Sequence, residues 1–277
     1  MEAIVEDPES LAALHAVSCG GRSMAWRQWG SGPVLVLVHG TGGSWTHWMR
    51  NVLPLARHFT VLAPDLPGHG DSELPEGEVS CRRFATLLWE GIDQLAGPDA
   101  TIAVAGFSLG SVLAESMALQ RPRRVRQVLL LRGSFAPAVP KPPELLRWRG
   151  IADPAERARI HRHNLAVSMF GNPGRIDDEA VAIQARNVER CRLDARPLLA
   201  SREVEAFATL GCAVHGIAGE LDVYGGGNVE AQGRALRQTL PQASFDLVPG
   251  AGHWAVYEAA EQVNAMMVNA LMRNPWG

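Results

Sequence analysis

The sequence of 277 residues lacks any long hydrophobic run. No stretch approaches the roughly 18 consecutive apolar residues that a membrane span needs. The longest run, VLVLV at 34–38, has the length of a buried strand. A strong excess of one charge is also missing, since 26 Lys and Arg stand against 29 Asp and Glu, a formal net charge of −3. These absences argue against a membrane protein and against a nucleic-acid partner.

Cysteine is scarce too. Cys19, Cys81, Cys191 and Cys212 are scattered along the chain, with no close pair that would suggest a zinc site or a redox motif. The opening MEAIVED is acidic and lacks the positive and apolar regions of a secretory signal. We therefore expect a cytoplasmic protein with reduced cysteines and no metal site.

What the sequence does contain is an alternation of short apolar strands and amphipathic helices. A hairpin is expected around the Gly20-Gly21 turn. Further strands are expected at 33–38, 59–64, 100–105, 126–131, 213–218 and 244–248, and helices at 46–57, 80–96, 109–121, 228–239 and 255–272. This alternation favours a parallel sheet that is covered by helices on both faces.

The alternation fails between about 138 and 204. Four prolines lie at its beginning, within 137–143. The pattern that follows predicts several helices and no convincing strand. An inserted helical subdomain explains the change of pattern. The predicted domains are an α/β core of residues 1–137 and 205–277 and a helical cap of residues 138–204.

A nucleophile is predicted at Ser108, in the pentapeptide GFSLG at 106–110. The pentapeptide follows a predicted buried strand and leads directly into a predicted helix. Such a turn forces its central residue into a strained backbone conformation, and glycines on either side remove side chains that would collide. The serine hydroxyl is thereby raised above the sheet edge, where a substrate can reach it. The bare pattern is common, so its position between strand and helix carries the prediction.

A base and an acid are predicted at two other strand ends. His253 follows the last strand, and Asp222 follows the strand at 213–218. Because the carboxyl ends of parallel strands meet at one edge of a sheet, both belong beside Ser108. A carboxylate there fixes the imidazole tautomer, so that the other ring nitrogen faces the serine. Glu220 is the alternative acid. The chain order Ser108, Asp222, His253 is also the order of serine, acid and histidine in hydrolases whose serine sits on such a strand-to-helix turn.

Backbone N–H groups that could stabilise an oxyanion are predicted at two places. The loop HGTGG at 39–43 follows a buried strand, and its small residues allow a close approach of Thr41 and Gly42 to a ligand. The N–H of Leu109, at the start of the predicted helix, is the second donor. A glycine loop that only makes a tight turn is the alternative.

With these motifs, the chain resembles the α/β-hydrolase superfamily. The matching stretches are HGTGG at 39–43, APDLPGHGDS at 63–72, GFSLG at 106–110, GELD at 219–222 and GHW at 252–254. The resemblance implies the α/β-hydrolase fold, with a mostly parallel eight-stranded sheet, helices on both faces and an inserted helical cap. It also implies hydrolysis of an ester, amide or related bond without a cofactor. The 65–72 segment is a structural turn in the family, so His69 and Asp71 are given no catalytic role.

The predicted function is therefore that of a serine hydrolase which cleaves a small carboxylic ester through an acyl-enzyme intermediate. Similar dehalogenases and epoxide hydrolases use aspartate at the nucleophile position, where this chain has Ser108. Carbon–carbon bond hydrolases and cofactor-free perhydrolases share the triad and remain alternatives; Phe107 is typical of the perhydrolases. A ligand-binding or accessory protein that keeps the triad but turns over little is an alternative of another class.

Contacts to a small-molecule acyl substrate are predicted at six positions: Trp45, Phe107, Met169, Phe170, Arg190 and Trp254. The arginines at 186, 190, 192 and 196 are spaced by about four residues, so some would share a helix face and bind a substrate carboxylate. The alternative is a solvated helix surface. No nucleic acid or membrane partner is expected, and the sequence does not determine the oligomeric state.

Overall fold

The computed structural model describes residues 7–132, 143–226 and 228–273. It contains one eight-stranded sheet in the order β1-β2-β4-β3-β5-β6-β7-β8. The strands are β1 (Ala13–Cys19), β2 (Arg22–Trp29), β3 (Val34–Val38), β4 (Thr60–Pro64), β5 (Ile102–Phe107), β6 (Val125–Leu131), β7 (Ala213–Gly219) and β8 (Ser244–Val248). β2 pairs antiparallel with β1 and β4, and the other pairings are parallel. The predicted, mostly parallel sheet is confirmed.

The helices lie between the strands as the alternation predicted. They are η1 (Trp45–Trp48), α1 (Val52–Ala56), α2 (Cys81–Ala96), α3 (Leu109–Gln120), α4 (Pro154–Ser168), η2 (Pro173–Arg175), α5 (Asp178–Glu189), α6 (Arg196–Ala200), η3 (Ala206–Thr209), η4 (Val223–Gly225), α7 (Val229–Thr239), α8 (Ala255–Glu258) and α9 (Ala260–Arg273).

Two predicted helices are broken in the structure. The helix expected at 46–57 is the short η1 followed by α1, and Pro54 explains the late start of α1 because proline is accepted only in the first turn of a helix. The helix expected at 255–272 is split into α8 and α9 at Ala259, whose backbone (φ −129°, ψ 44°) lies outside the helical region.

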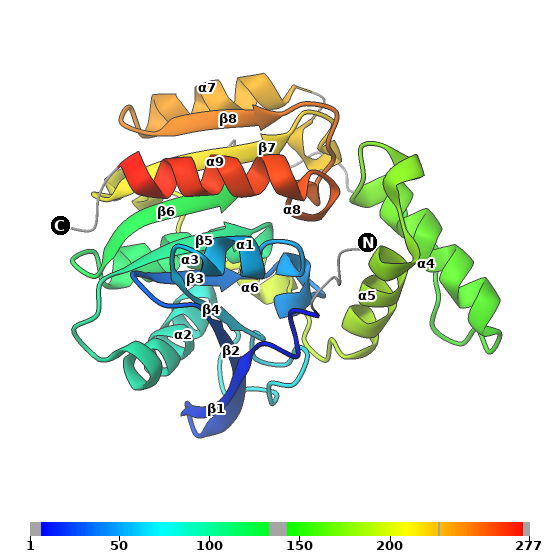
Figure 1. Cartoon of the computed structure of the whole chain (residues 1–277), viewed down its shortest axis with the longest axis horizontal. Helices are drawn as coiled ribbons and strands as arrows, with labels where there is room; N and C mark the ends of the chain where they lie inside the picture. The colour runs from blue at the N-terminus through cyan, green and yellow to red at the C-terminus, as the bar shows by residue number, and fades with distance from the viewer. Residues whose placement is uncertain (1–6, 133–142, 227, 274–277) are drawn as a thin grey trace, which may run out of the picture.

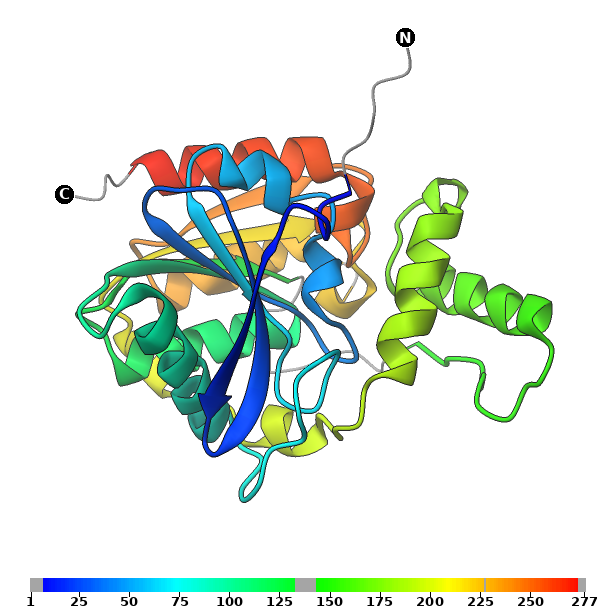
Figure 2. The same ribbon diagram turned by 60° about the horizontal axis from the view of Figure 1, so that its bottom comes forward.

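The sheet has a hydrophobic core on each face. Alternate side chains of β3 point to opposite faces, so Leu35 and Leu37 join a core with α1 and α9, while Val36 and Val38 join a core with α2 and α3. Figures 1 and 2 show α1 and α9 on one face of the sheet and α2 and α3 on the other. Both faces are therefore covered, and the loops at the strand ends are left to form a site.

The helices α4 and α5 stand beside the sheet, beyond the carboxyl ends of the strands (Figures 1 and 2). Within residues 143–204 the chain forms helices and loops and no strand. Leu165 of α4 and Ile183 of α5 are buried in the same core as α1 and α9. The predicted cap boundary near residue 138 lies outside the described residues.

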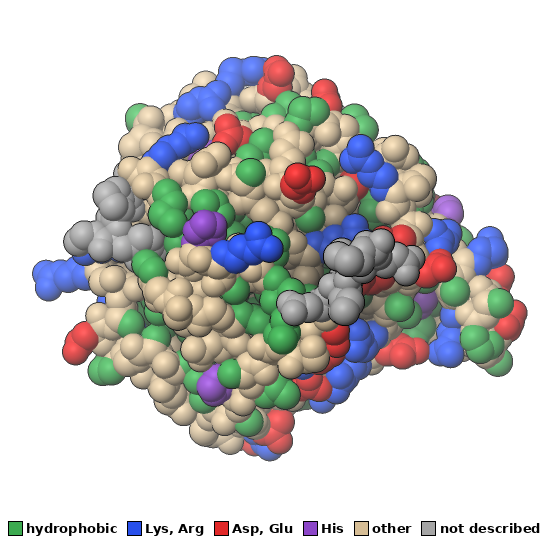
Figure 3. Space-filling model, in the orientation of Figure 1, with side chains coloured by type: hydrophobic (Ala, Val, Ile, Leu, Met, Phe, Trp, Pro, Cys, Tyr) green, Lys and Arg blue, Asp and Glu red, His purple; other side chains and the backbone are tan. Residues whose placement is uncertain are grey.

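Charges of both signs are mixed on the molecular surface. On the face that Figure 3 shows, Lys or Arg and Asp or Glu side chains lie among one another, also over the α4–α5 region at the right. In the part of the chain that the structure describes, no helix is long and apolar enough to cross a membrane.

Candidate active site

Ser108 sits on a sharp turn between β5 and α3. Its backbone has φ 53° and ψ −116°, and it is the one non-glycine residue with positive φ among the described residues. Such a conformation costs about 1–3 kcal/mol and persists only where the surroundings enforce it. The N–H of Ser108 donates to the carbonyl of Leu131 on β6 across 3.0 Å, while its hydroxyl does not cap the helix that it begins. The hydroxyl therefore remains available to a substrate.

The glycines around Ser108 are required by close backbone contacts. A Cβ on Gly106 would lie 2.2 Å from the carbonyl oxygen of Gly110, and one on Gly110 would lie 2.1 Å from that of Val38. A Cβ on Gly40, in the loop after β3, would lie 3.0 Å from the Cβ of Ser108. Only glycine fits at positions 106 and 110, and a side chain at position 40 would be crowded, so the loop predicted to stabilise an oxyanion lies directly against Ser108.

His253 and Asp222, predicted from separate strand ends, are in direct contact. The Nδ1 atom of His253 lies 2.7 Å from Oδ2 of Asp222, and both side chains are buried. The other carboxylate oxygen, Oδ1, accepts the N–H of Tyr224 at 2.8 Å. With its Nδ1–H donated to Asp222, a neutral His253 keeps Nε2 as a proton acceptor. Glu220, the alternative acid, is exposed and instead accepts the N–H of Gly250 at 2.8 Å.

An aromatic ring connects His253 with the turn that carries Ser108. The ring of Phe107, the residue before Ser108, lies 5.1 Å from the imidazole between centroids. The ring of Tyr224 lies 4.5 Å from the imidazole. The imidazole thus lies near two aromatic rings, one of which belongs to the residue next to Ser108.

The loop after β3 makes a tight turn. The N–H of Gly43 donates to the carbonyl of Gly40 across 3.2 Å, and Gly42 has φ +65°, a value that favours glycine. Thr41, between them, is exposed. The turn leaves the predicted donors Thr41 and Gly42 on the loop that touches Ser108. Leu109, the third predicted donor, is the first residue of α3.

Three buried histidines in or near this loop, His39, His47 and His69, were not predicted to take part in the site. His47 accepts the N–H of Gly40 at its Nδ1, across 3.2 Å, and His39 accepts the N–H of Leu66 at its Nε2, across 2.8 Å. The ring of His69 lies 5.2 Å from that of His39. The sequence offered two signals for them: His39 lies at a strand end, and His47 lies between two tryptophans. They were passed over because most histidines are surface or structural residues.

Burial keeps these imidazoles neutral. The pKa of His47 is lowered to about 3, first by burial and then by the nearby His253 and His69. The pKa of His69 is lowered to about 4, mainly by burial, and burial likewise lowers the pKa of His39 well below its ordinary value. Neutral rings can accept backbone N–H groups, as His47 and His39 do, and the bond from Gly40 to His47 supports the shape of the loop beside Ser108.

Four of the six predicted substrate contacts are buried aromatic residues: Trp45, Phe107, Phe170 and Trp254. Trp45 packs against Trp29 with ring centroids 5.3 Å apart. Trp254 stacks on Tyr257 at 4.3 Å, and its indole N–H donates to the carbonyl of His47 across 3.0 Å. Packing accounts for these contacts, and a role in acyl binding stays a prediction for them and for the half-buried Met169.

Arg190 lies on the surface and has a protein partner. Its Nη2 lies 2.5 Å from Oδ1 of Asp71, and both side chains are exposed. Arg186 lies 3.9 Å from Glu9, and Arg196 pairs with Asp194. Arg192 instead donates to the backbone carbonyls of Gly70 and Ser72. The predicted arginine series therefore has separate protein partners, three carboxylates and a pair of carbonyls, and does not form one anion site.

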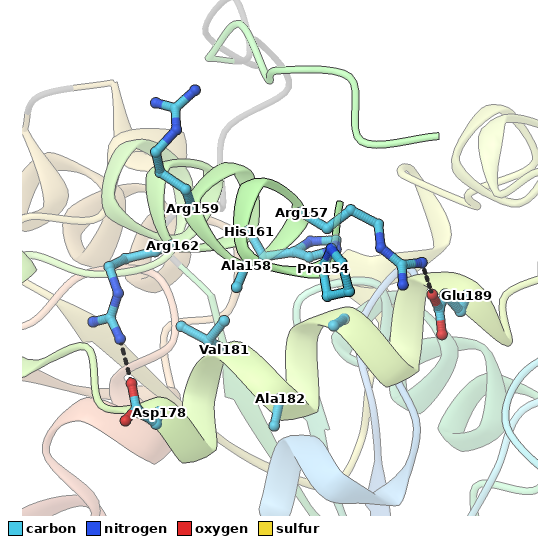
Figure 4. Close-up of a pocket in the computed structure, with 11 residues that line it drawn as sticks. Pro154, Arg157, Ala158, Arg159, His161, Arg162, Asp178, Val181, Ala182 and Glu189 are labelled. Carbon is cyan, nitrogen blue, oxygen red and sulfur yellow. Dashed lines mark hydrogen bonds and ion pairs between the residues drawn. The ribbon is translucent and has the colours of Figure 1, made fainter. Parts of the chain in front are cut away.

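A groove of about 480 Å³ lies between α4 and α5. Figure 4 shows ion pairs at both of its ends, Arg157 with Glu189 and Arg162 with Asp178. The side chains of Ala158, Val181 and Ala182 lie between them. These two arginines are thus paired across the two helices, while Arg159 pairs with Glu156 within α4. Elsewhere in the described residues, no cluster of three or more His, Cys, Asp or Glu could hold a metal ion.

Comparisons with known proteins concern the family and the fold. The model of the alpha/beta hydrolase family matches residues 35–266. Pimeloyl-[acyl-carrier protein] methyl ester esterase of Vibrio parahaemolyticus is 34% identical over 129 residues, 47% of this chain and 46% of that protein. A soluble epoxide hydrolase of Corynebacterium sp. is 40% identical over 118 residues, 42% of this chain and 40% of that protein. Over these stretches the chain spans less than half the length of its relatives.

Solved structures extend the likeness of the fold to nearly the whole chain. An epoxide hydrolase from Vigna radiata superposes with a TM-score of 0.74 at 22% identity, covering 94% of this chain and 97% of that one. At this identity the likeness shows the fold. Since the family model matches most of the chain and the sheet has the expected architecture, the chain belongs to the alpha/beta hydrolase family.

Proposed function

We propose that this chain is a serine hydrolase that cleaves a small carboxylic ester or a related acyl compound through an acyl-enzyme intermediate. The observation that carries the proposal is the 2.7 Å contact between the buried side chains of His253 and Asp222. Ser108, held at φ 53°, directly follows Phe107, whose ring lies 5.1 Å from the imidazole of His253. A strained serine and a base oriented by a buried acid are the parts that nucleophilic catalysis requires. The stretch similar to a methyl ester esterase supports an ester as the substrate.

The proposed reaction uses the side chains in sequence. Ser108 Oγ attacks the substrate carbonyl, and its proton passes to Nε2 of His253. Asp222 stabilises the imidazolium that forms. The N–H groups of Thr41 and Leu109, with Gly42 beside them, stabilise the oxyanion of the tetrahedral intermediate; one such donor contributes about 3–4 kcal/mol.

The second half of the reaction releases the acid. The tetrahedral intermediate collapses, the bond to the leaving alcohol breaks, and His253 returns the proton to that alcohol. Water then attacks the acyl group on Ser108 and gives a proton to His253. Collapse of the second intermediate frees the carboxylic acid and restores the Ser108 hydroxyl.

The test compares wild type, Ser108→Ala and the exposed control Ser31→Ala on p-nitrophenyl acetate and butyrate. We expect Ser108→Ala to lower kcat by roughly 10⁶-fold, as removal of a triad serine does elsewhere, and Ser31→Ala to leave it unchanged. A fluorophosphonate probe should add its mass to Ser108 of the wild type. Turnover retained by Ser108→Ala would contradict the proposal. Labelling without turnover of any ester, thioester or lactone would instead favour another acyl chemistry or a binding role.

A further inference from the structure

The carboxylate of Glu258 joins the loop that carries His253 to the segment that follows α4. Glu258 is the last residue of α8, and its side chain is buried. Its Oε2 accepts the N–H of Gly252 at 2.7 Å and that of Gly171 at 2.9 Å, and its Oε1 accepts the N–H of Asn172 at 2.8 Å. One anion thus binds the residue directly before His253 and two residues between α4 and η2.

The two segments also touch directly. The N–H of Trp254, the residue after His253, donates to the carbonyl of Met169 across 2.7 Å. A Cβ on Gly252 would lie 2.3 Å from the backbone nitrogen of Gly171, and a Cβ on Gly171 would lie 2.8 Å from that of Gly252. No side chain fits between these backbones, so neither segment can shift there without moving the other.

On its other side, the same loop is held by the segment that carries Asp222. The N–H of Leu221 donates to the carbonyl of Ala251 across 2.8 Å, and the N–H of Glu220 donates to that of Val248 across 3.0 Å. These bonds fix the loop relative to the acid. The bonds to Glu258 fix it relative to residues 169–172. Hydrogen bonds to a charged acceptor are about twice as strong as neutral ones, so Glu258 is a strong restraint.

We propose that Glu258 is a positioning residue for His253: it sets where the imidazole is presented to Ser108, and it makes that position depend on residues 169–172 of the helical insertion. This proposal rests on the proposed hydrolase function. The physical reason is distance, because Gly252 is one peptide bond from His253 and a displacement of about 1 Å in a catalytic group can cost about 100-fold in rate.

The first test is Glu258→Gln, with Glu261→Gln as its control. Glutamine keeps the volume of the side chain but replaces one acceptor oxygen by an NH₂ group, which faces backbone N–H donors. Glu261 is exposed in the first turn of α9 and carries the same change without these contacts. The activity on p-nitrophenyl acetate is divided by the number of sites that a fluorophosphonate titrates, so that unfolded molecules do not count.

We expect Glu258→Gln to lower kcat per titrated site by about 10- to 100-fold with little change in KM, and Glu261→Gln to change neither. The thermal midpoint is recorded beside the rates. If Glu258 served the fold alone, the number of titrated sites or the thermal midpoint would fall, while kcat per site stayed at the wild-type value. That result would overturn the proposal.

A second variant tests the coupling from the other side. Gly171→Ala places a methyl group against the backbone of 250–252, whereas the control Gly211→Ala meets nothing within 4 Å. We expect kcat per site to fall in Gly171→Ala alone, and this variant carries the test if Glu258→Gln does not fold. An unchanged kcat per site in Gly171→Ala would overturn the coupling. If the wild type is not labelled by the fluorophosphonate and hydrolyses no ester, the proposed hydrolase function is wrong. That failure is seen in the wild type, so it is distinct from a failure of the variants.

Discussion

The imidazole of His47 accepts a hydrogen bond from the backbone N–H of Gly40, with Nδ1 and N separated by 3.2 Å. A Cβ added at Gly40 would lie 3.0 Å from the Cβ of Ser108, so a buried side chain supports the shape of the loop beside Ser108. The bond requires a neutral imidazole, since a protonated ring has no acceptor nitrogen.

Acid should therefore destabilise the protein through His47. Its pKa is about 3 in the folded state and about 6.5 in the unfolded chain, so the unfolded state binds more protons between these values. The free energy of unfolding is then highest above pH 6.5 and falls as the pH falls toward 3, by up to about 1.4 kcal/mol per pH unit for this group. The free energy of unfolding is measured by urea titration at several pH values between 7 and 4.5. It should fall less steeply with decreasing pH in His47→Gln than in the wild type, and an equal pH dependence would contradict the assignment.

Asp222→Asn should remove most of the activity while the fold persists. The amide can still accept the N–H of Tyr224, but it carries no charge to stabilise an imidazolium and its NH₂ group favours the wrong tautomer of His253. We expect kcat to fall by about 10⁴-fold on p-nitrophenyl acetate. Glu220→Gln, which alters the exposed neighbouring acid, is the control. A loss below tenfold in Asp222→Asn would rule out this acid.

Gly110→Ala should destabilise the nucleophile turn. The new Cβ would lie 2.1 Å from the carbonyl oxygen of Val38, and both atoms belong to rigid elements. Alanine gains about 1 kcal/mol of helix propensity over glycine, which the overlap exceeds. We expect the free energy of unfolding to drop by about 2 kcal/mol in urea titrations. Gly211→Ala, in open space, should change it by less than about 0.5 kcal/mol, and equal values for the two variants would refute the argument.

Arg190→Ala should affect neither stability nor substrate preference. The Arg190–Asp71 pair is exposed, and such pairs contribute about 0–1 kcal/mol. The measurement is the ratio of kcat/KM for an ester that bears a free carboxylate and for its neutral analogue. An unchanged ratio is expected. A selective loss of activity on the acidic ester would show that Arg190 leaves Asp71 to bind substrate.

The sequence alone determined the alternation of elements and the order of the site residues. The segments 33–38 and 100–105 were predicted as buried strands because short apolar runs are typical of strands that are covered on both faces, and the structure has strands at Val34–Val38 and Ile102–Phe107. Because parallel strands share one carboxyl edge, Ser108, Asp222 and His253 could be assigned to that edge before any contact was known. The breaks in the helices at 46–57 and 255–272 were missed, since hydrophobic periodicity indicates that a segment is helical but does not show where the helix is interrupted, as near Pro54 and at Ala259.

Only the tertiary structure decided which side chains meet. In the structure His253 is hydrogen-bonded to Asp222 and not to Glu220, and Arg190 forms an ion pair with Asp71. His47 accepts the backbone N–H of Gly40. It also brought Glu258 to Gly171, a pair that no spacing along the chain would connect. The reason is physical: strands and turns follow from interactions between near neighbours in the chain, whereas partner choice among charged and polar groups depends on packing between distant segments.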